Sequence, residues 1–113
     1  MFAETVGGLD DVFLQVKNLE AMRTYYKDVL GFQEEFYHEG WGSGLRTGGA
    51  VLVLRASEKG SSGVSLVFAC SDIDRSLKAA TEQGSTITSP ITEGHWGAKV
   101  AGFEDPEDNT LLL

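Results

Sequence analysis

A chain of 113 residues is long enough for one ordinary hydrophobic core, and 42% apolar residues with charges of both signs is the composition of a folded domain. The net charge of −8, with nine Lys and Arg scattered along the chain, excludes a basic surface for nucleic acid. No apolar run approaches the roughly 20 residues that span a bilayer, and the start of the chain has no basic region followed by an apolar stretch. We therefore expect a cytoplasmic protein of one domain (1–113), with no nucleic acid and no membrane among its partners.

The first half of the chain predicts a strand, a helix and three further strands. The apolar-rich "DVFLQV" (11–16) is the strand, and Asn18 then supplies the N-cap of a helix that Gly31 ends. The buried face of that helix is predicted from helical spacing at Leu19, Met22, Tyr26 and Val29. The three strands are expected at about 32–38, 41–47 and 50–55, separated by the turn residues of "EGWGSG" and "TGG".

The second half repeats this order after a Gly- and Ser-rich linker at about 56–63. "SLVFAC" (65–70) predicts the strand, Ser71 the N-cap and Gly84 the end of a helix. The buried stripe of this helix is expected at Ile73, Leu77 and Ala80, and three strands follow at about 85–89, 97–103 and 109–113. Cys70, the one cysteine, has no partner for an internal disulfide and is expected to be a buried structural thiol in its apolar strand.

The two halves are copies of one unit. Val16 corresponds to Cys70, Gly31 to Gly84 and Trp41 to Trp96, at spacings of 53 to 55 residues. The strings "HEGWG" (38–42) and "EGHWG" (93–97) are near-copies that contain both tryptophans and both histidines of the chain. We therefore predict an α+β fold of two tandem βαβββ modules, at about 9–55 and 64–113.

Two longer motifs resemble the vicinal oxygen chelate superfamily, which includes glyoxalase I, bleomycin resistance proteins, fosfomycin resistance proteins and extradiol dioxygenases. They are "VKNLEAMRTYYKDVLGF" and "WGAKVAGFEDPEDNTLLL", the second similar to the family's Trp-Gly followed by Asp-Pro-x-Gly-Asn and a last strand. The resemblance implies that the two modules curl into an open eight-stranded cup with a single site on its concave face. In style the chain is nearest to the small bleomycin-resistance-like members that use no metal.

The resemblance also implies four metal-ligand positions, and in this chain they fall on Asp11, Ser65, Leu112 and either Leu52 or Leu54. Only Asp11 has a side chain that binds divalent metals well, because a leucine offers no donor atom. We therefore expect neither a metal nor another cofactor. A different metal site, built from His38, His95 and a carboxylate such as Glu39 or Glu93, stays open as an alternative.

The lining of the cup is predicted from strand alternation, because residues two apart share a face. Asp11, Phe13, Gln15, Ser65, Val67 and Ala69 are expected to face the cavity, while Val12, Leu14, Val16, Leu66, Phe68 and Cys70 face the helices. Further residues of the wall or mouth are expected at Phe36, His38, Trp41, His95, Trp96, Lys99, Ala101 and Leu112. Such a pocket is apolar and aromatic with a few polar groups.

A pocket of this kind suits a small, planar or mainly apolar organic molecule, and the acidic chain favours a cationic one. The expected function is therefore ligand binding without chemistry, such as antibiotic sequestration of the bacterial bleomycin-resistance type, by a homodimer in which exposed strand edges are covered. Two alternatives remain. Asp11 could act as a general acid or base in a lyase, isomerase or dioxygenase of the same superfamily, or the cup could be filled and the protein serve an interaction or regulatory role.

Overall fold

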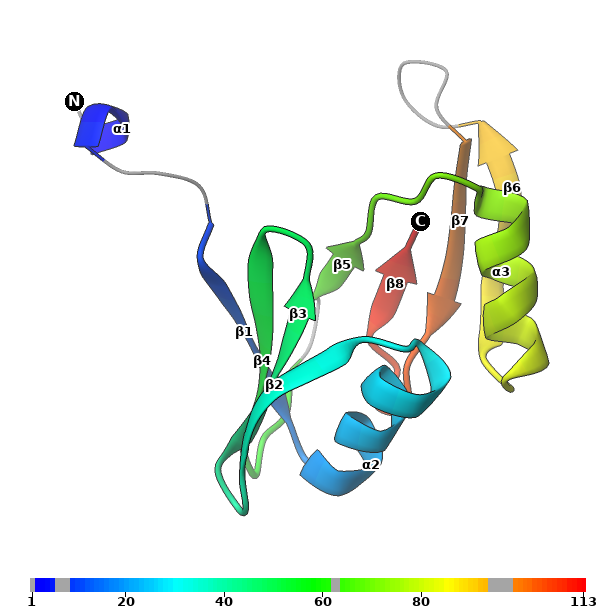
Figure 1. Cartoon of the computed structure of the whole chain (residues 1–113). Helices are drawn as coiled ribbons and strands as arrows, with labels where there is room; N and C mark the ends of the chain where they lie inside the picture. The colour runs from blue at the N-terminus through cyan, green and yellow to red at the C-terminus, as the bar shows by residue number, and fades with distance from the viewer. Residues whose placement is uncertain (1, 6–8, 62–63, 94–98) are drawn as a thin grey trace.

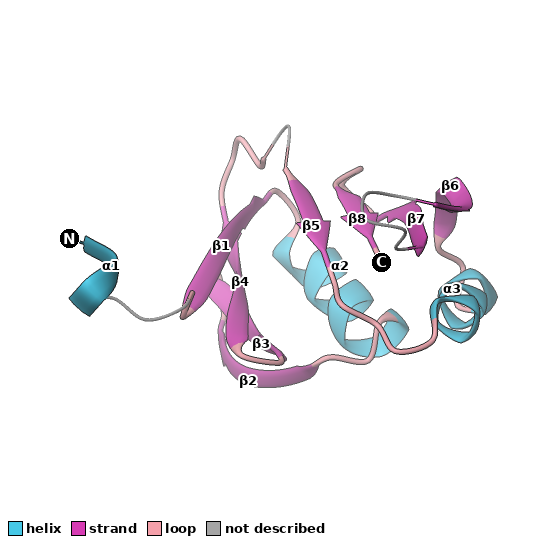
Figure 2. Cartoon of the chain, turned by 90° about the horizontal axis from the view of Figure 1, so that it is seen from above, coloured by secondary structure: helices cyan, strands magenta, loops and turns pink. Residues whose placement is uncertain are grey.

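Two four-stranded sheets lie side by side in the computed structural model, which describes residues 2–5, 9–61, 64–93 and 99–113 (Figure 1). Helix α2 (Leu19–Thr24) and its continuation η1 (Tyr25–Val29) lie between the sheets in both views (Figures 1 and 2). The sheets do not join into a closed barrel. The predicted α+β class is confirmed.

The first module forms one sheet in the order β1-β4-β3-β2. Its strands are β1 (Asp11–Val16), β2 (Gln33–His38), β3 (Gly42–Thr47) and β4 (Ala50–Ala56). Strands β1 and β4 run parallel, and the other two pairs are antiparallel. A short helix, α1 (Phe2–Thr5), precedes the module and lies away from the sheets (Figure 1).

The second module repeats this topology in the order β5-β8-β7-β6, again with a parallel pair at one edge. Its strands are β5 (Ser65–Val67), β6 (Thr86–Glu93), β7 (Lys99–Glu104) and β8 (Thr110–Leu112), and its helix is α3 (Ile73–Glu82). Both modules therefore have the predicted βαβββ order. No helix among the described residues combines the length and the apolar character that crossing a membrane requires.

The helix boundaries follow the predicted capping residues, with one correction. The Asn18 side chain accepts the N–H of Ala21 at 3.0 Å, and both Gly31 and Gly84 have positive φ, at 80° and 96°. The second helix, however, is capped by Asp72 rather than Ser71. Asp72 accepts a backbone N–H at 3.1 Å, because the first helical residue follows Asp72 directly.

Equivalent positions of the two modules are 54 residues apart before the helices (Val16 and Cys70) and 53 residues apart after them (Gly31 and Gly84). The π-helical segment η1 accounts for this difference. η1 is a π-helical segment, and a π-bulge holds one residue more than the same stretch of α-helix. Helix α3 is α-helical over its whole length. The extra residue in the first module is therefore absorbed inside the helix, and both glycines still end their helices.

Cys70 is exposed, so the prediction of a buried thiol is wrong. The strand β5 spans only Ser65–Val67 and makes one further bond to β8, from the N–H of Phe68 to the carbonyl of Leu112 at 2.8 Å. Beyond that bond the chain leaves the sheet. The alternation that buries Leu66 and Phe68 consequently does not reach Cys70.

The hydrophobic core lies on the helix side of both sheets and takes residues from both modules. Its buried members are Leu14, Val16, Leu19, Met22, Tyr25, Tyr26, Leu45, Leu52, Leu54, Phe103 and Leu111. The predicted alternation in β1 is confirmed, because Leu14 and Val16 are buried while Asp11, Phe13 and Gln15 are exposed.

Two buried tyrosines of η1 connect the modules. The hydroxyl of Tyr26 donates to Oδ2 of Asp105 at 2.8 Å, and both residues are buried. The neighbouring Tyr25 hydroxyl lies 2.8 Å from Oγ of Ser85 and also reaches the carbonyl of Glu104 at 3.2 Å. The Tyr-Tyr pair of the first module is thus held by the loops that flank two strands of the second.

The loop between β7 and β8 is built around Asp105. Its Oδ1 accepts the N–H groups of Glu107 and Asn109 at 2.9 and 3.0 Å, and the Asn109 amide donates to both oxygens. Glu107 in turn accepts the N–H groups of Lys17 and Asn18 at 2.8 and 2.7 Å. A residue of the second module therefore satisfies the start of helix α2, where the capping-box position holds Ala21 instead of an acid.

A charged cluster ties the edge strand β2 to helix α2. Glu34 accepts from Arg23 Nη2 at 2.8 Å and from Ser43 Oγ at 2.6 Å, and its side chain is only 14% exposed. The hydrogen bond from Arg23 holds the pKa of Glu34 below its usual range. The carboxylate is therefore ionised and paired at neutral pH.

Candidate functional site

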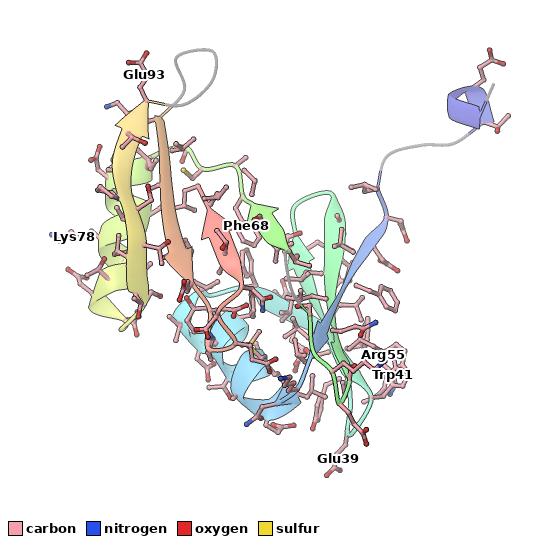
Figure 3. All side chains as sticks on the ribbon, turned by 180° about the vertical axis from the view of Figure 1, so that it is seen from behind. Glu39, Trp41, Arg55, Phe68, Lys78 and Glu93 are labelled. Atoms are coloured by element: carbon pink, nitrogen blue, oxygen red, sulfur yellow. The ribbon has the colours of Figure 1, made fainter. Side chains whose placement is uncertain are left out.

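The side of the first sheet that faces away from helix α2 carries six of the candidate residues, Asp11, Phe13, Gln15, Phe36, His38 and Trp41. The strand register places two rows across it, Phe13, Val53, Gly44 and Phe36 in one and Gln15, Arg55, Gly42 and His38 in the next. Figure 3 shows Trp41 and Arg55 on this outer side, away from the second module. We call the surface formed by Phe13, Phe36, His38, Trp41 and Arg55 the aromatic face.

Three rings of the aromatic face surround a shallow hollow of about 460 Å³. The ring centroids of Phe36 and Trp41 are 6.2 Å apart, and His38 lies 5.6 Å from Phe36 and 6.0 Å from Trp41. The Arg55 guanidinium covers the Trp41 ring, 4.5 Å from its centroid. Trp41 is 38% exposed and Phe13 is 57% exposed, so the aromatic surface is open to solvent.

Two glycines of β3 lie so close to neighbouring atoms that neither position has room for a side chain. A Cβ on Gly44 would lie 2.1 Å from Cε1 of Phe36, so the phenyl ring rests directly on the glycine backbone. A Cβ on Gly42 would lie 2.6 Å from the carbonyl oxygen of Leu54. The "GSG" at 42–44 lies in strand β3, within the strand expected at about 41–47, and its glycines serve close packing there.

The sequence pattern alone does not identify Arg55 and Val53 as residues of this side of the sheet. Both belong to β4, whose four central residues are all buried and give no clear alternation. The signal that could have found them is the parallel pairing of β4 with β1, because that pairing aligns Val53 with Phe13 and Arg55 with Gln15.

Charged residues lie at one end of the same face. Asp11 is exposed and shares a row with Arg46, which makes a bidentate pair with Glu35 at 2.8 and 3.0 Å. The pKa of Arg46 is raised, chiefly by the hydrogen bond to Glu35 and to a smaller extent by Asp10 and Asp11. The alternative in which Asp11 is a general acid or base assumes that its carboxyl lies in an apolar pocket. In a single chain Asp11 is exposed to solvent.

The remaining described candidates lie on the second sheet. Ser65 and Val67 are exposed, Val67 is paired with Leu112, and Lys99 is exposed at the start of β7. Ala101 is buried at 2% exposure. These residues belong to the other sheet, and none of them lines the hollow among Phe36, His38 and Trp41. His95 and Trp96 lie outside the described residues.

The register corrects one of the implied metal positions. Asp11 pairs with Val51 in the first module as Ser65 pairs with Thr110 in the second, so the equivalent of Leu112 is Val53. The expectation of Leu52 or Leu54 is wrong by one residue, which reverses the face of the strand: both leucines are buried in the core.

The donor set at these positions does not fit a divalent metal. With Val53 in place, one carboxylate and one hydroxyl are the only oxygen donors, and they lie on separate sheets. Within the part of the chain that the structure describes, no three His, Cys, Asp or Glu side chains lie close enough to hold an ion. The alternative site with His38 and His95 includes a residue outside that part, and the absence of a metal remains a prediction.

Comparisons with known proteins agree with the fold. The chain matches the Glyoxalase/Bleomycin resistance protein/Dioxygenase superfamily over residues 8–113. An integron cassette protein from the mobile metagenome of the Halifax Harbour sewage outfall is similar in structure, with a TM-score of 0.81, 25% identity, and 95% of this chain and 97% of that one covered. A family enzyme from Burkholderia phytofirmans PsJN has a TM-score of 0.77 and 25% identity over 91% and 94% of the two chains.

A third similar structure is TnmS3, an antibiotic binding protein from Streptomyces sp. CB03234, with a TM-score of 0.84, 19% identity, and 96% and 95% of the two chains covered. A search of curated protein sequences found no match. The fold and the family match agree. Each of the two modules has a parallel strand pair at one edge of its sheet, and the match covers nearly the whole chain. The chain belongs to the Glyoxalase/Bleomycin resistance protein/Dioxygenase superfamily.

Proposed function

We propose that the protein binds a planar, mainly apolar organic molecule against the aromatic face and does not transform it. The observation that carries this proposal is the exposure of Phe13 and Trp41 on one surface with Phe36 and His38. Contiguous exposed apolar surface of this kind marks a binding site in soluble proteins. Offset stacking on each ring would contribute about 0.5–1.5 kcal/mol beyond the burial of apolar area.

The polar groups beside the rings define what else the ligand carries. Arg55 and His38 are hydrogen-bond donors at the rim of the hollow, and Gln15 lies in the same row. A carbonyl or hydroxyl oxygen at the edge of the flat ligand would accept from them. The net charge of −8 would attract cationic ligands over a longer range.

A second copy of the chain completes the cup in this proposal. Both sheets present exposed apolar residues on the side away from their helices, Phe13 at 57% and Val67 at 69% exposure. If the second sheet of a partner covers the aromatic face, both patches are buried and Ser65, Val67 and Leu112 become the opposite wall. The similarity in fold to an antibiotic binding protein supports sequestration of a drug-like ligand in such a cup.

The proposal is tested by the fluorescence of Trp41. In a Trp96→Phe background Trp41 is the single tryptophan, and titration with a bleomycin-type compound or with ethidium should quench its emission. Phe36→Ala should weaken the quenching at least tenfold, because the ring that stacks with Trp41 is lost. Tyr37→Phe is the matched control, since Tyr37 is the next residue of β2 and packs on the helix side.

Three results would contradict the proposal. Absence of quenching with every planar compound would remove the main support for a ligand on this face. Equal losses in Phe36→Ala and Tyr37→Phe would show that the effect comes from general damage to β2. Slow conversion of a bound compound, lost on Asp11→Asn, would instead favour the enzyme alternative.

A further inference from the structure

A second and larger cavity, of about 680 Å³, lies between the two modules. Its walls include Val12 and Leu52 of the first sheet and Leu66, Phe68 and Phe103 of the second module. Phe32 and Phe68 meet across the module boundary with ring centroids 5.3 Å apart. Figure 3 shows Phe68 between the sheets, on the opposite side of the first sheet from Trp41.

The cavity exists because the two helices differ at equivalent positions. At the spacing of 54 residues that relates Asp11 to Ser65, the positions of Met22, Tyr25 and Tyr26 are taken by Ser76, Ala79 and Ala80. The first three side chains are buried and fill the core beneath the first sheet. The second three line the cavity, so the side-chain volume that α3 lacks is the space observed.

The lining defines the chemistry of an occupant. None of the described residues around the cavity has a charged side chain, and the polar side chains among them are two hydroxyls, Thr47 and Ser76, and the thiol of Cys70. Burial of a charge against such walls would be costly, whereas a neutral hydrocarbon or aromatic group loses nothing on entry. The volume falls in the range of about 300–1,000 Å³ that is typical of sites for small molecules.

The cavity is accessible from solvent. Ala69 and Cys70 both line it and are exposed. Ala69 and Cys70, which follow the end of β5, therefore form a rim through which a small molecule can enter.

We propose that this inter-module cavity is a second binding site, for a neutral and mainly hydrocarbon or aromatic small molecule. It is separate from the aromatic face, because Val12 and Leu52 face the cavity while their neighbours Phe13 and Val53 lie in a row of the opposite face. Its occupant contacts both modules at once and stabilises their packing.

The test uses N-phenyl-1-naphthylamine, a neutral probe whose emission rises in apolar surroundings. Ser76→Met places in α3 the residue that the first module has at the equivalent position, and it should weaken probe binding at least tenfold by filling the cavity. Lys78→Met introduces the same side chain at an exposed position of α3 that does not line the cavity, and it should bind the probe like the parent protein. Circular dichroism of both variants verifies the fold.

Cys70 supplies a second readout. Bound probe should slow the reaction of the Cys70 thiol with an anionic disulfide reagent at least threefold, and Cys70→Ser should abolish the reaction. Equal probe binding in Ser76→Met and Lys78→Met, or no emission increase up to the solubility of the probe, would overturn the proposal. So would a loss of probe binding in Trp41→Ala with Ser76→Met unaffected, because the probe would then occupy the aromatic face.

Discussion

Replacement of Tyr26 by Phe removes one buried hydroxyl from the joint between the modules. The Tyr26 side chain is fully buried, and its hydroxyl donates at 2.8 Å to Asp105, which is 4% exposed. Burial raises the pKa of Tyr26, and the charge of Asp105 and the hydrogen bond to it raise it further. The hydroxyl is therefore protonated at neutral pH and donates to a carboxylate.

The expected loss in the free energy of unfolding depends on the charge of the acceptor, Asp105. A hydrogen bond to a charged group contributes about 1.5–3 kcal/mol to stability, against about 1 kcal/mol for a neutral pair. In the variant Asp105 still accepts from the N–H of Glu107 and from the backbone and amide of Asn109, so the carboxylate stays largely satisfied. We expect a loss of about 2 kcal/mol in the free energy of unfolding, or roughly 6–10 °C in Tm.

Urea unfolding followed by circular dichroism measures this loss, and Tyr25→Phe is the matched control. The Tyr25 hydroxyl bonds to the neutral Ser85 and to the carbonyl of Glu104, so its removal should cost about 1 kcal/mol. If Tyr26→Phe stays within about 0.5 kcal/mol of the parent, or if Tyr25→Phe loses more, the joint does not depend on the charged acceptor.

The Tyr26 hydroxyl should also make the free energy of unfolding depend on pH in the alkaline range. Because its pKa in the folded state is raised above the usual value of about 10, the unfolded chain releases its proton first as pH increases. The stability that protonated Tyr26 supplies is present below about pH 10 and decreases above it. The free energy of unfolding should therefore decrease more steeply above pH 10 in the parent than in Tyr26→Phe, and equal slopes would contradict this assignment.

Four further perturbations have expected outcomes. Gly44→Ala should displace the phenyl ring above it and weaken ligand quenching at least fivefold, whereas Gly49→Ala, which meets no atom within 4 Å, should not. Asp108→Gly should raise stability by about 0.5 kcal/mol in urea unfolding, because Asp108 has a φ of 61°. Glu34→Gln should lower the free energy of unfolding by about 1–2 kcal/mol at pH 7. Because the pKa of Glu34 is lowered in the folded state, this stability is present above about pH 4.5 and is lost as pH falls further. The free energy of unfolding should therefore depend less on acidic pH in the variant than in the parent. Sedimentation at low micromolar concentration should give a dimer that Val67→Asp dissociates, and a monomeric parent would refute the proposed cup.

Strand β1 shows what could be predicted from the sequence. Leu14 and Val16 alternate with Phe13 and Gln15, and a period of two assigns each side chain to a face without knowledge of the rest of the fold. The duplication then carried the same assignment to the second module, where Ser65 and Val67 are exposed as expected. Local periodicity and internal repetition were sufficient for the fold class.

The sequence could not predict which surface each sheet would meet. Alternation places Phe13 on a face, but the packing of the modules depends on long-range contacts such as Tyr26 with Asp105. Cys70 was misplaced because a strand's last residue depends on its hydrogen-bonding partner, and β5 pairs with β8 only as far as Phe68. Arg55 was missed because a strand buried along four consecutive residues shows no period.

The bonds from Glu107 to the N–H groups of Lys17 and Asn18 have a consequence for biosynthesis. The ribosome produces the chain from its N-terminus, so residues 17 and 18 are made long before residue 107, the last partner that the start of α2 requires. Contacts between such distant segments form late and slow the folding of a chain. Until residue 107 has been made, the nascent helix α2 has its Asn18 cap but lacks the two bonds that hold its start to the second module.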